Sequence, residues 1–385
     1  MAFIAPPTPL RLAVALDGLG WHPAAWRTSP ADAAAVFTAD HWAGLVREAE
    51  AGLLDLVTFE DTFGPPTDAP GELNGRLDAV LVASRVAPLT RHIGLVPVAT
   101  TTYTEPFHLS TALATLDYLS GGRAGWQARV SRRPGEAALL GRRPAPIGEE
   151  AVRDLFDEAA DAVEVVRRLW DSWADDAVIR DVATGRFIDR DKLHAIDFAG
   201  RWFSVKGPSI VPRPPQGQPV VAALAHGPRS YELAGRGADV VFVTPSDEAE
   251  AAEIAARFRA PEPALKVFAD LVVFLDDHGG DALARRNRLD DLHGSSWHSD
   301  ALIFAGSPEQ LADLLVAWRA AGIDGFRLRP GALPYDLEAI TRLLVPVLQD
   351  RGVFRTREPS GTLRSRLGLP PAVNRYESPE GARVA

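Results

Sequence analysis

The 385-residue sequence contains no cysteine. Disulfide bonds, thiolate nucleophiles, zinc–thiolate sites and iron–sulfur clusters are therefore excluded. A chain without disulfides fits a reducing compartment, and its first residues lack the basic segment of a signal peptide, so we expect a cytoplasmic protein. The sequence also lacks a run of about 18 apolar residues, which argues against a membrane-spanning helix.

Basic residues are outnumbered: 41 Lys and Arg stand against 51 Asp and Glu, giving a net charge of −10. A surface of this sign repels a phosphate backbone, so we expect no nucleic-acid partner. The nine histidines are scattered, without an HxH or HExxH pattern, and we predict no metal site. A G-x-S-x-G nucleophile elbow is also missing.

What is present is an alternation of apolar segments and amphipathic segments along the whole chain. We predict eight strands, at Leu10–Asp17, Leu53–Glu60, His92–Ala99, Arg123–Ser131, Pro219–Ala225, Asp239–Thr244, Leu265–Leu275 and Asp324–Arg329. We predict helices between and after them, at Thr38–Ala51, Leu77–Ala87, Phe107–Leu119, Glu149–Trp173, Arg229–Arg236, Asp247–Ala260, Pro308–Ala321 and Asp336–Gln349.

Apolar strands without strict alternation are typical of a parallel sheet covered on both faces, and eight strand–helix units predict a closed (β/α)₈ TIM barrel. The alternative is an open doubly wound sheet. That fold would need a glycine-rich phosphate turn after the first strand, and residues 17–22 (DGLGWH) lack its third glycine.

Two segments fall outside the repeat within this single predicted domain of residues 1–385. Residues 175–215 are polar and rich in Gly and Pro, and we interpret them as an insertion before strand five that covers the barrel mouth. Residues 353–385 show no periodicity, and we expect a C-terminal arm that wraps the barrel or a neighbouring subunit.

The carboxyl ends of barrel strands carry the active site in this architecture. At the predicted strand ends the sequence places aromatic and hydroxyl side chains with few paired carboxylates, which favours a planar ligand over sugar hydrolysis. Trp21, Trp26 and Phe63 suggest an apolar or aromatic pocket wall, although each could equally be a packing residue.

At these positions the chain resembles the nitrilotriacetate and dibenzothiophene-sulfone monooxygenase branch of the bacterial luciferase-like flavin enzymes. The matching stretches cover most of the chain in the order of the family. They include ADHWAGLVREAEAGLLDLVTFED (39–61), TTYTEPFHLSTALATLDYLSGGRAGW (101–126) and LWDSW (169–173).

The resemblance implies a luciferase-like barrel that binds FMN at its mouth, takes reduced FMN from a separate reductase and uses O₂ to oxygenate a small organic substrate. It also implies a homodimer or higher homo-oligomer. By position, Asp61, Thr100 and Thr101 correspond to residues beside the flavin ring. His22 corresponds to the histidine that faces the substrate, and we take it as the candidate catalytic residue.

Several positions depart from the family pattern. The flavin-contacting His and Tyr of the family fall on Val152 and Phe156, and its asparagine falls on Gln127. The phosphate loop reads ALAHGPRS (223–230), in which Gly227 keeps a flexible backbone and His226 could supply charge. Three hypotheses follow: an FMN-dependent monooxygenase, a deazaflavin-dependent hydride-transfer enzyme on the same barrel, and a non-catalytic ligand-binding member.

Overall fold

The computed structural model describes residues 9–30, 32–65, 69, 71–141, 143–144, 147–259 and 265–377. Eight parallel strands close into a barrel, each strand hydrogen-bonded to two neighbours in the ring. In ring order they are β1 (Arg11–Leu16), β2 (Leu56–Phe59), β3 (Gly94–Thr100), β4 (Gly125–Arg129), β9 (Val220–Ala225), β10 (Val240–Val243), β11 (Lys266–Leu275) and β13 (Gly325–Pro330). The predicted barrel and its eight strands are confirmed.

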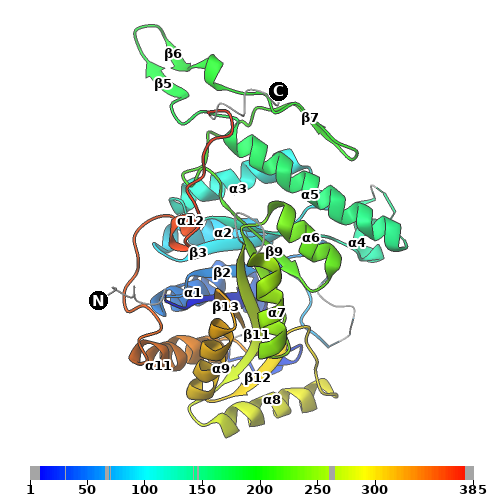
Figure 1. Cartoon of the computed structure of the whole chain (residues 1–385). Helices are drawn as coiled ribbons and strands as arrows, with labels where there is room; N and C mark the ends of the chain where they lie inside the picture. The colour runs from blue at the N-terminus through cyan, green and yellow to red at the C-terminus, as the bar shows by residue number, and fades with distance from the viewer. Residues whose placement is uncertain are drawn as a thin grey trace.

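Helices cover the outside of the barrel (Figure 1). They are α1 (Ala39–Ala51), α2 (Ala79–Val86), α3 (Pro106–Ser120), α5 (Glu149–Asp171), α6 (Pro228–Gly237), α7 (Glu248–Arg259), α9 (Pro308–Ala320), and a last helical segment formed by α10 (Tyr335–Ala339), a π-turn (Ile340–Leu344) and α11 (Val345–Asp350). Sequence signals set their ends: α3 starts with a proline and stops at Gly121, whose φ of 65° suits glycine. None of the described helices is both long and apolar enough to cross a membrane.

The elements that were not predicted include three that lie between the barrel strands. A short helix α4 (Pro134–Leu140) follows β4, and a helix α8 (Gly279–His293) and a strand β12 (Leu302–Gly306) follow β11. β12 pairs with the upper half of β11, from Leu271 onward, while the lower half of β11 pairs with β10. In α8 only Ala282 and Leu289 are buried, so the helix lacks the apolar stripe by which sequence analysis recognises a helix.

The barrel interior changes character along its axis. Its lower layers are apolar, with residues such as Leu56, Val96 and Phe268 packed in one buried cluster. Its upper layer holds a buried group of polar side chains that includes Asp270 and Arg327. The polar layer lies directly beneath the mouth, on the side where the strands end.

The C-terminal arm closes the opposite end of the barrel. Its helix α12 (Leu363–Arg366) buries Leu363 completely in the apolar interior, together with Leu367. The backbone N–H of Leu363 donates to the carbonyl of Gly122, just before β4. The described part of the arm therefore stays on its own barrel, while residues 378–385 lie outside the described residues.

The insertion at residues 175–215 does not lie where we expected it. It forms two small hairpins, β5–β6 (Val178–Asp181 and Arg186–Ile188) and β7–β8 (Phe198–Ala199 and Ser204–Val205), and the first projects from the body at the top of Figure 1. No residue of it lines the cavities at the mouth. The reason is topological: α5 returns the chain to the end where strands begin, and the insertion follows α5 directly.

Candidate functional site

A cavity of about 520 Å³ opens at the carboxyl ends of the strands. This volume falls in the range of small-molecule sites, about 300–1,000 Å³. Six residues predicted from the sequence line it: Trp21, Gln127, Val152, Phe156, His226 and Gly227. They come from the loop after β1, from β4, from α5 and from the turn between β9 and α6, so residues far apart in sequence meet in one place. Their contacts with a cofactor stay a prediction.

One end of this larger cavity lies at the start of α6. There the hydroxyl of Ser230 accepts hydrogen bonds from the backbone N–H groups of His226 (3.1 Å) and Gly227 (3.2 Å). Pro228, the first residue of the helix, has no N–H to offer. The turn therefore presents fewer free amides to an anion than a glycine-rich phosphate loop does.

Cationic side chains surround the same end of the larger cavity. Arg132 and Arg229 both line it. The guanidinium of Arg229 is paired with Glu232 at 2.9 Å on the exposed side of the helix, and that of Arg132 contacts no charged or hydrogen-bonding group among the described residues. These two cations can bind a phosphate where amides are lacking.

A buried ionic network forms the floor of the larger cavity. Asp270 is fully buried and accepts hydrogen bonds from both Arg327 and Arg329, whose Nε atoms lie 2.8 Å and 3.0 Å from its carboxylate oxygens. Arg329 also donates to Asp300 at 2.6 Å. Burial opposes the charge of Arg329, but the two carboxylates raise its pKa. The floor is therefore permanently charged and rigidly held.

Polar groups reach from this floor toward the cavity. Arg327 donates to the amide oxygen of Gln127 at 2.6 Å, which fixes the orientation of that amide. Glu60 lines the cavity with a side chain only 10% exposed, 3.4 Å from Arg129. Carboxylate, amide and guanidinium groups thus face the centre of the barrel mouth.

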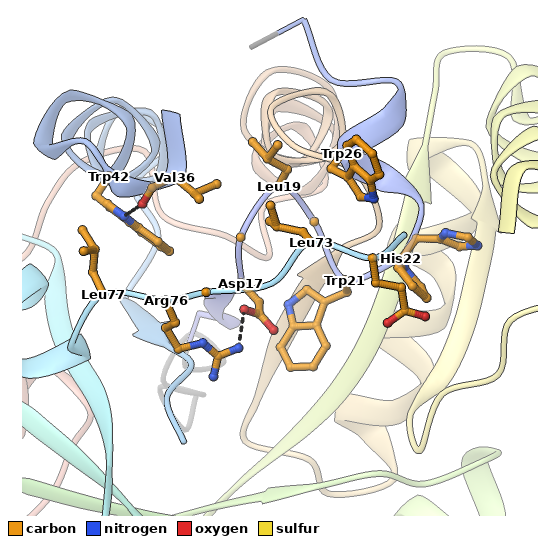
Figure 2. Close-up of a pocket in the computed structure, with 15 residues that line it drawn as sticks. Asp17, Leu19, Trp21, His22, Trp26, Val36, Trp42, Leu73, Arg76 and Leu77 are labelled. Atoms are coloured by element: carbon orange, nitrogen blue, oxygen red, sulfur yellow. Dashed lines mark hydrogen bonds and ion pairs between the residues drawn. The ribbon is translucent and has the colours of Figure 1, made fainter. Parts of the chain in front are cut away.

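A second, smaller cavity of about 210 Å³ is shown in Figure 2, and Trp21 lines both cavities. Trp26 and His22 line the smaller cavity, and so do Asp17 and Arg76, which form an ion pair at 2.8 Å. Burial raises the pKa of the Asp17 carboxyl, and Arg76 opposes that effect. Trp21 therefore stands as a partition between two spaces of different size.

His22 is held by its surroundings on both ring nitrogens. Its Nδ1 accepts from the backbone N–H of Ala24 at 3.1 Å, and its Nε2 lies 3.1 Å from a carboxylate oxygen of Asp290. Since Nδ1 is an acceptor, the imidazole carries its proton on Nε2, and this N–H donates a hydrogen bond to Asp290. Burial lowers the pKa of this imidazole. A ring engaged in this way supports the loop, and neither nitrogen is free for a substrate in this arrangement.

Four residues predicted for the site line neither cavity. Asp61 instead accepts hydrogen bonds from the backbone N–H groups of Thr62 and of Ala79, the first residue of α2, and burial raises its pKa. Thr101 donates its hydroxyl to the carbonyl of Arg129. Thr100 is buried at the end of β3, and Phe63 lies on the surface with 36% of its area exposed.

Sequence reasoning did not select the floor residues. Arg327 and Arg329 stand two apart in a predicted barrel strand, so both point to the same face, and two inward arginines are a strong signal in an otherwise apolar segment. The single acidic residue of the strand FADLVVFL (268–275), Asp270, is the matching signal. Within the described residues no three His, Cys, Asp or Glu side chains form a group that could hold a metal ion.

Comparisons with known proteins agree with this geometry. The family model described as luciferase-like monooxygenase matches residues 20–290. N-acetyl-S-(2-succino)cysteine monooxygenase of Bacillus subtilis (strain 168) is 33% identical, with 95% of this chain and 98% of the relative aligned. Dibenzothiophene-sulfone monooxygenase of Rhodococcus erythropolis is 31% identical, over 90% of this chain and 93% of the relative.

A similar solved structure is a riboflavin lyase with modified FMN and its substrate riboflavin. It superposes with a TM-score of 0.85 at 25% identity and covers 98% of this chain and 99% of its own. The EDTA monooxygenase of Chelativorans sp. BNC1 superposes with a TM-score of 0.80 at 25% identity, over 94% of this chain and 99% of its own.

Proposed function

Given that the chain belongs to the luciferase-like monooxygenase family, we propose that it oxygenates a small organic substrate with reduced FMN and O₂, the reduced flavin coming from a separate reductase. The observation that carries the proposal is the larger cavity at the barrel mouth, whose lining includes cationic side chains and a polar floor held by hydrogen bonds. Relatives named as components or subunits support the two-protein arrangement: nitrilotriacetate monooxygenase component A of Aminobacter aminovorans is 29% identical over 94% of this chain.

The residues of the larger cavity fit the parts of FMN. Arg132 and Arg229 are suited to the phosphate group, since one guanidinium group can donate two parallel hydrogen bonds to two phosphate oxygens. The polar edge of the ring would meet Gln127, whose amide Arg327 holds in place. Phe156 provides an apolar wall.

When bound, reduced FMN would supply the two electrons by which one atom of O₂ enters the substrate and the other leaves as water. The work of the chain is to bind, to orient and to exclude bulk water. Trp21 is fixed for this task, because its indole N–H donates to the carbonyl of Ala15 at 2.8 Å and its ring lies 4.5 Å from the guanidinium carbon of Arg329. His22 keeps the loop that carries Trp21 attached to α8 through Asp290.

The test is an anaerobic titration of the purified chain with chemically reduced FMN and, in parallel, with a reduced deazaflavin. We expect saturation by reduced FMN at micromolar to sub-millimolar concentration, and tighter binding of FMN than of deazaflavin. Failure to saturate at millimolar reduced FMN would contradict the proposal. The double variant Val152→His, Phe156→Tyr restores the polar pair of the family and should tighten FMN binding.

Val152 and Phe156 are also the observation that favours the second candidate, a deazaflavin-dependent hydride-transfer enzyme. Apolar side chains at these positions remove polar contacts that a flavin ring would otherwise receive. Tighter binding of deazaflavin in the same titration would replace the first proposal with this one. A chain that binds FMN but consumes no O₂ with any substrate tested would fit the third hypothesis, a non-catalytic ligand-binding member.

A further inference from the structure

The smaller cavity has walls made of tryptophan faces. Trp21, Trp26 and Trp42 line it from the loop after β1 and from α1 (Figure 2). Each indole N–H is already used by a backbone carbonyl: Trp21 donates to Ala15, Trp26 to Gly71 and Trp42 to Val36, at 2.8, 3.1 and 2.8 Å. With their donors occupied, these side chains offer a ligand only ring faces and edges.

Three other polar side chains of the smaller cavity, those of Asp17, Arg76 and His22, already have partners. Arg76 donates to Asp17, and both ring nitrogens of His22 are engaged. Aliphatic side chains, among them Leu73 and Leu77, fill the remaining wall. The Asp17–Arg76 pair and the carboxylate of Glu72 are therefore the charged groups that can orient a ligand.

Charge excludes anionic ligands from the smaller cavity. Asp17 and Glu72 line it against a single guanidinium, that of Arg76, which Asp17 already pairs. A carboxylate entering the cavity would meet more negative than positive charge in a poorly solvated space.

Charge also disfavours cations there, although tryptophan cages often bind them. The guanidinium carbon of Arg329 lies 4.5 Å from the centre of the Trp21 ring, and that of Arg27 lies 5.4 Å from the ring of Trp26. Two of the three rings thus already carry a cation on one face. A neutral ligand avoids both penalties.

We propose that the smaller cavity binds the substrate, and that the substrate is a neutral aromatic or heteroaromatic compound, or group, of one or two rings. The size follows from the volume: an apolar cavity of about 150 Å³ holds benzene, and this one measures about 210 Å³. Stacking on Trp21 would bring such a compound next to the larger cavity, with the Asp17–Arg76 pair beside it. The inference rests on the proposed function for its meaning as a substrate site.

Binding is measured by isothermal titration calorimetry on the chain without flavin, using three probes of one shape: quinoline, N-methylquinolinium and quinoline-2-carboxylate. We expect quinoline to bind, and the cationic and anionic analogues to bind at least about tenfold more weakly, a difference of about 1.4 kcal/mol. Trp26→Ala should weaken quinoline about tenfold. The control Trp202→Ala, on the distant β7–β8 hairpin, should leave quinoline binding unchanged.

Leu73→Trp is a second variant that fills the cavity from a loop, so it tests the site even if Trp26→Ala destabilises the fold. It should abolish quinoline binding without lowering the melting temperature. The proposal is overturned if quinoline shows no binding at about 5 mM, where a Kd of about 1 mM (about −4.1 kcal/mol) would give near-saturation. It is also overturned if Trp26→Ala and Leu73→Trp leave the affinity for quinoline unchanged, or if the carboxylate binds more tightly than quinoline.

Reduced FMN titrated into the same variants keeps the two proposals apart. Trp26→Ala should lower the affinity for quinoline but not for reduced FMN, since of the two cavities Trp26 lines only the smaller. Phe156→Ala should weaken FMN but not quinoline, since Phe156 lines only the larger one. Quinoline binding without FMN binding would remove the proposed function and keep the aromatic site; the reverse result would remove the aromatic site alone.

Discussion

The two ends of the barrel are formed by the same eight strands but are closed by different means. At the end where strands begin, the arm inserts Leu363 and Leu367 into an apolar interior. At the mouth, no such plug is present among the described residues: a floor of paired charges lies beneath two cavities. One end uses shape and apolar burial to give stability, and the other accepts the cost of buried charges in order to hold polar groups in fixed positions.

Removing the negative charge of Asp270, which links the two arginines of the floor, should have the largest effect on the free energy of unfolding. Asp270→Asn removes the buried carboxylate that Arg327 and Arg329 share and leaves Arg329 with Asp300 alone, and we expect a loss of about 3–5 kcal/mol in the free energy of unfolding. Urea denaturation measures it. Asp300→Asn, whose side chain is 43% exposed, is the control and should cost less than about 1 kcal/mol. Equal losses in the two variants would mean that the floor is not the rigid base described here.

The second-largest effect should come from a cavity in the plug, the side chains of Leu363 and Leu367 that fill the end of the barrel where the strands begin. Leu363 is fully buried, and Leu363→Ala should cost about 2–5 kcal/mol through lost burial and the cavity that remains. Flavin affinity of the folded protein should not change, since the plug lies at the other end of the barrel. Leu119→Ala, 54% exposed on α3, is the matched control and should be nearly neutral. A change in flavin affinity with Leu363→Ala would show that the two ends are coupled.

A change in the wall of the larger cavity should show the opposite pattern. Phe156 is half-buried, so Phe156→Ala should lower stability by only about 1 kcal/mol but weaken reduced FMN about tenfold. Thermal unfolding and anaerobic titration measure the two quantities. Arg153→Ala, exposed on the same helix, should alter neither. If Phe156→Ala lost stability and kept its FMN affinity, the assignment of the larger cavity would be wrong.

The smallest effect concerns acid. Burial lowers the pKa of His22 in the folded protein, although Asp290 opposes this effect. The neutral imidazole therefore stabilises the fold above pH 6.5, the pKa of an unfolded histidine, and this contribution is lost as the pH falls below 6.5. Near the arm, burial raises the pKa of Asp239, but Arg167 and Arg364 outweigh this effect and hold that pKa below 3.8. The contribution of the Asp239 carboxylate to folding stability is therefore lost only below pH 3.8. Lowering the pH from 7 to 5 should therefore reduce local stability around His22 at the mouth and leave it unchanged around Leu363 at the other end.

Hydrogen exchange of residues 290–297 and 363–369, corrected at each pH for the intrinsic exchange rate of an unfolded chain, tests this order. Exchange should rise in the first segment and stay level in the second. His22→Gln removes the titrating group and should remove the difference between the two pH values. An equal rise in both segments would point to a global loss of stability instead.

The sequence predicted the fold well because apolar strands between amphipathic helices are a local pattern. It missed β12, whose residues are mostly half-buried, and α8, where few residues are buried, since neither carries a strong apolar period. For the same reason the position of residues 175–215 was missed: a polar segment shows that a loop exists, and only the path of α5 shows at which end it lies.

The site was predicted in part. Positions in the larger cavity followed from strand ends and from the family resemblance, because both depend on order along the chain. The partners of His22 and Arg329 did not follow, since Asp290 and Asp300 come from an unpredicted region far away in sequence. Local sequence also cannot reveal that Ser230 occupies the amides of the phosphate turn, because its signal is one hydroxyl three residues beyond Gly227.

The plug also has a consequence for how the chain reaches its native state. β1 pairs with β13, and the arm that follows β13 packs Leu363 and Leu367 into the barrel interior. During synthesis β1 must therefore wait until β13 has been made before its second neighbour exists, a closure of high contact order. Until then apolar strand edges stay open to association with other chains. Docking of the arm thus ends the period in which this barrel is most prone to aggregate.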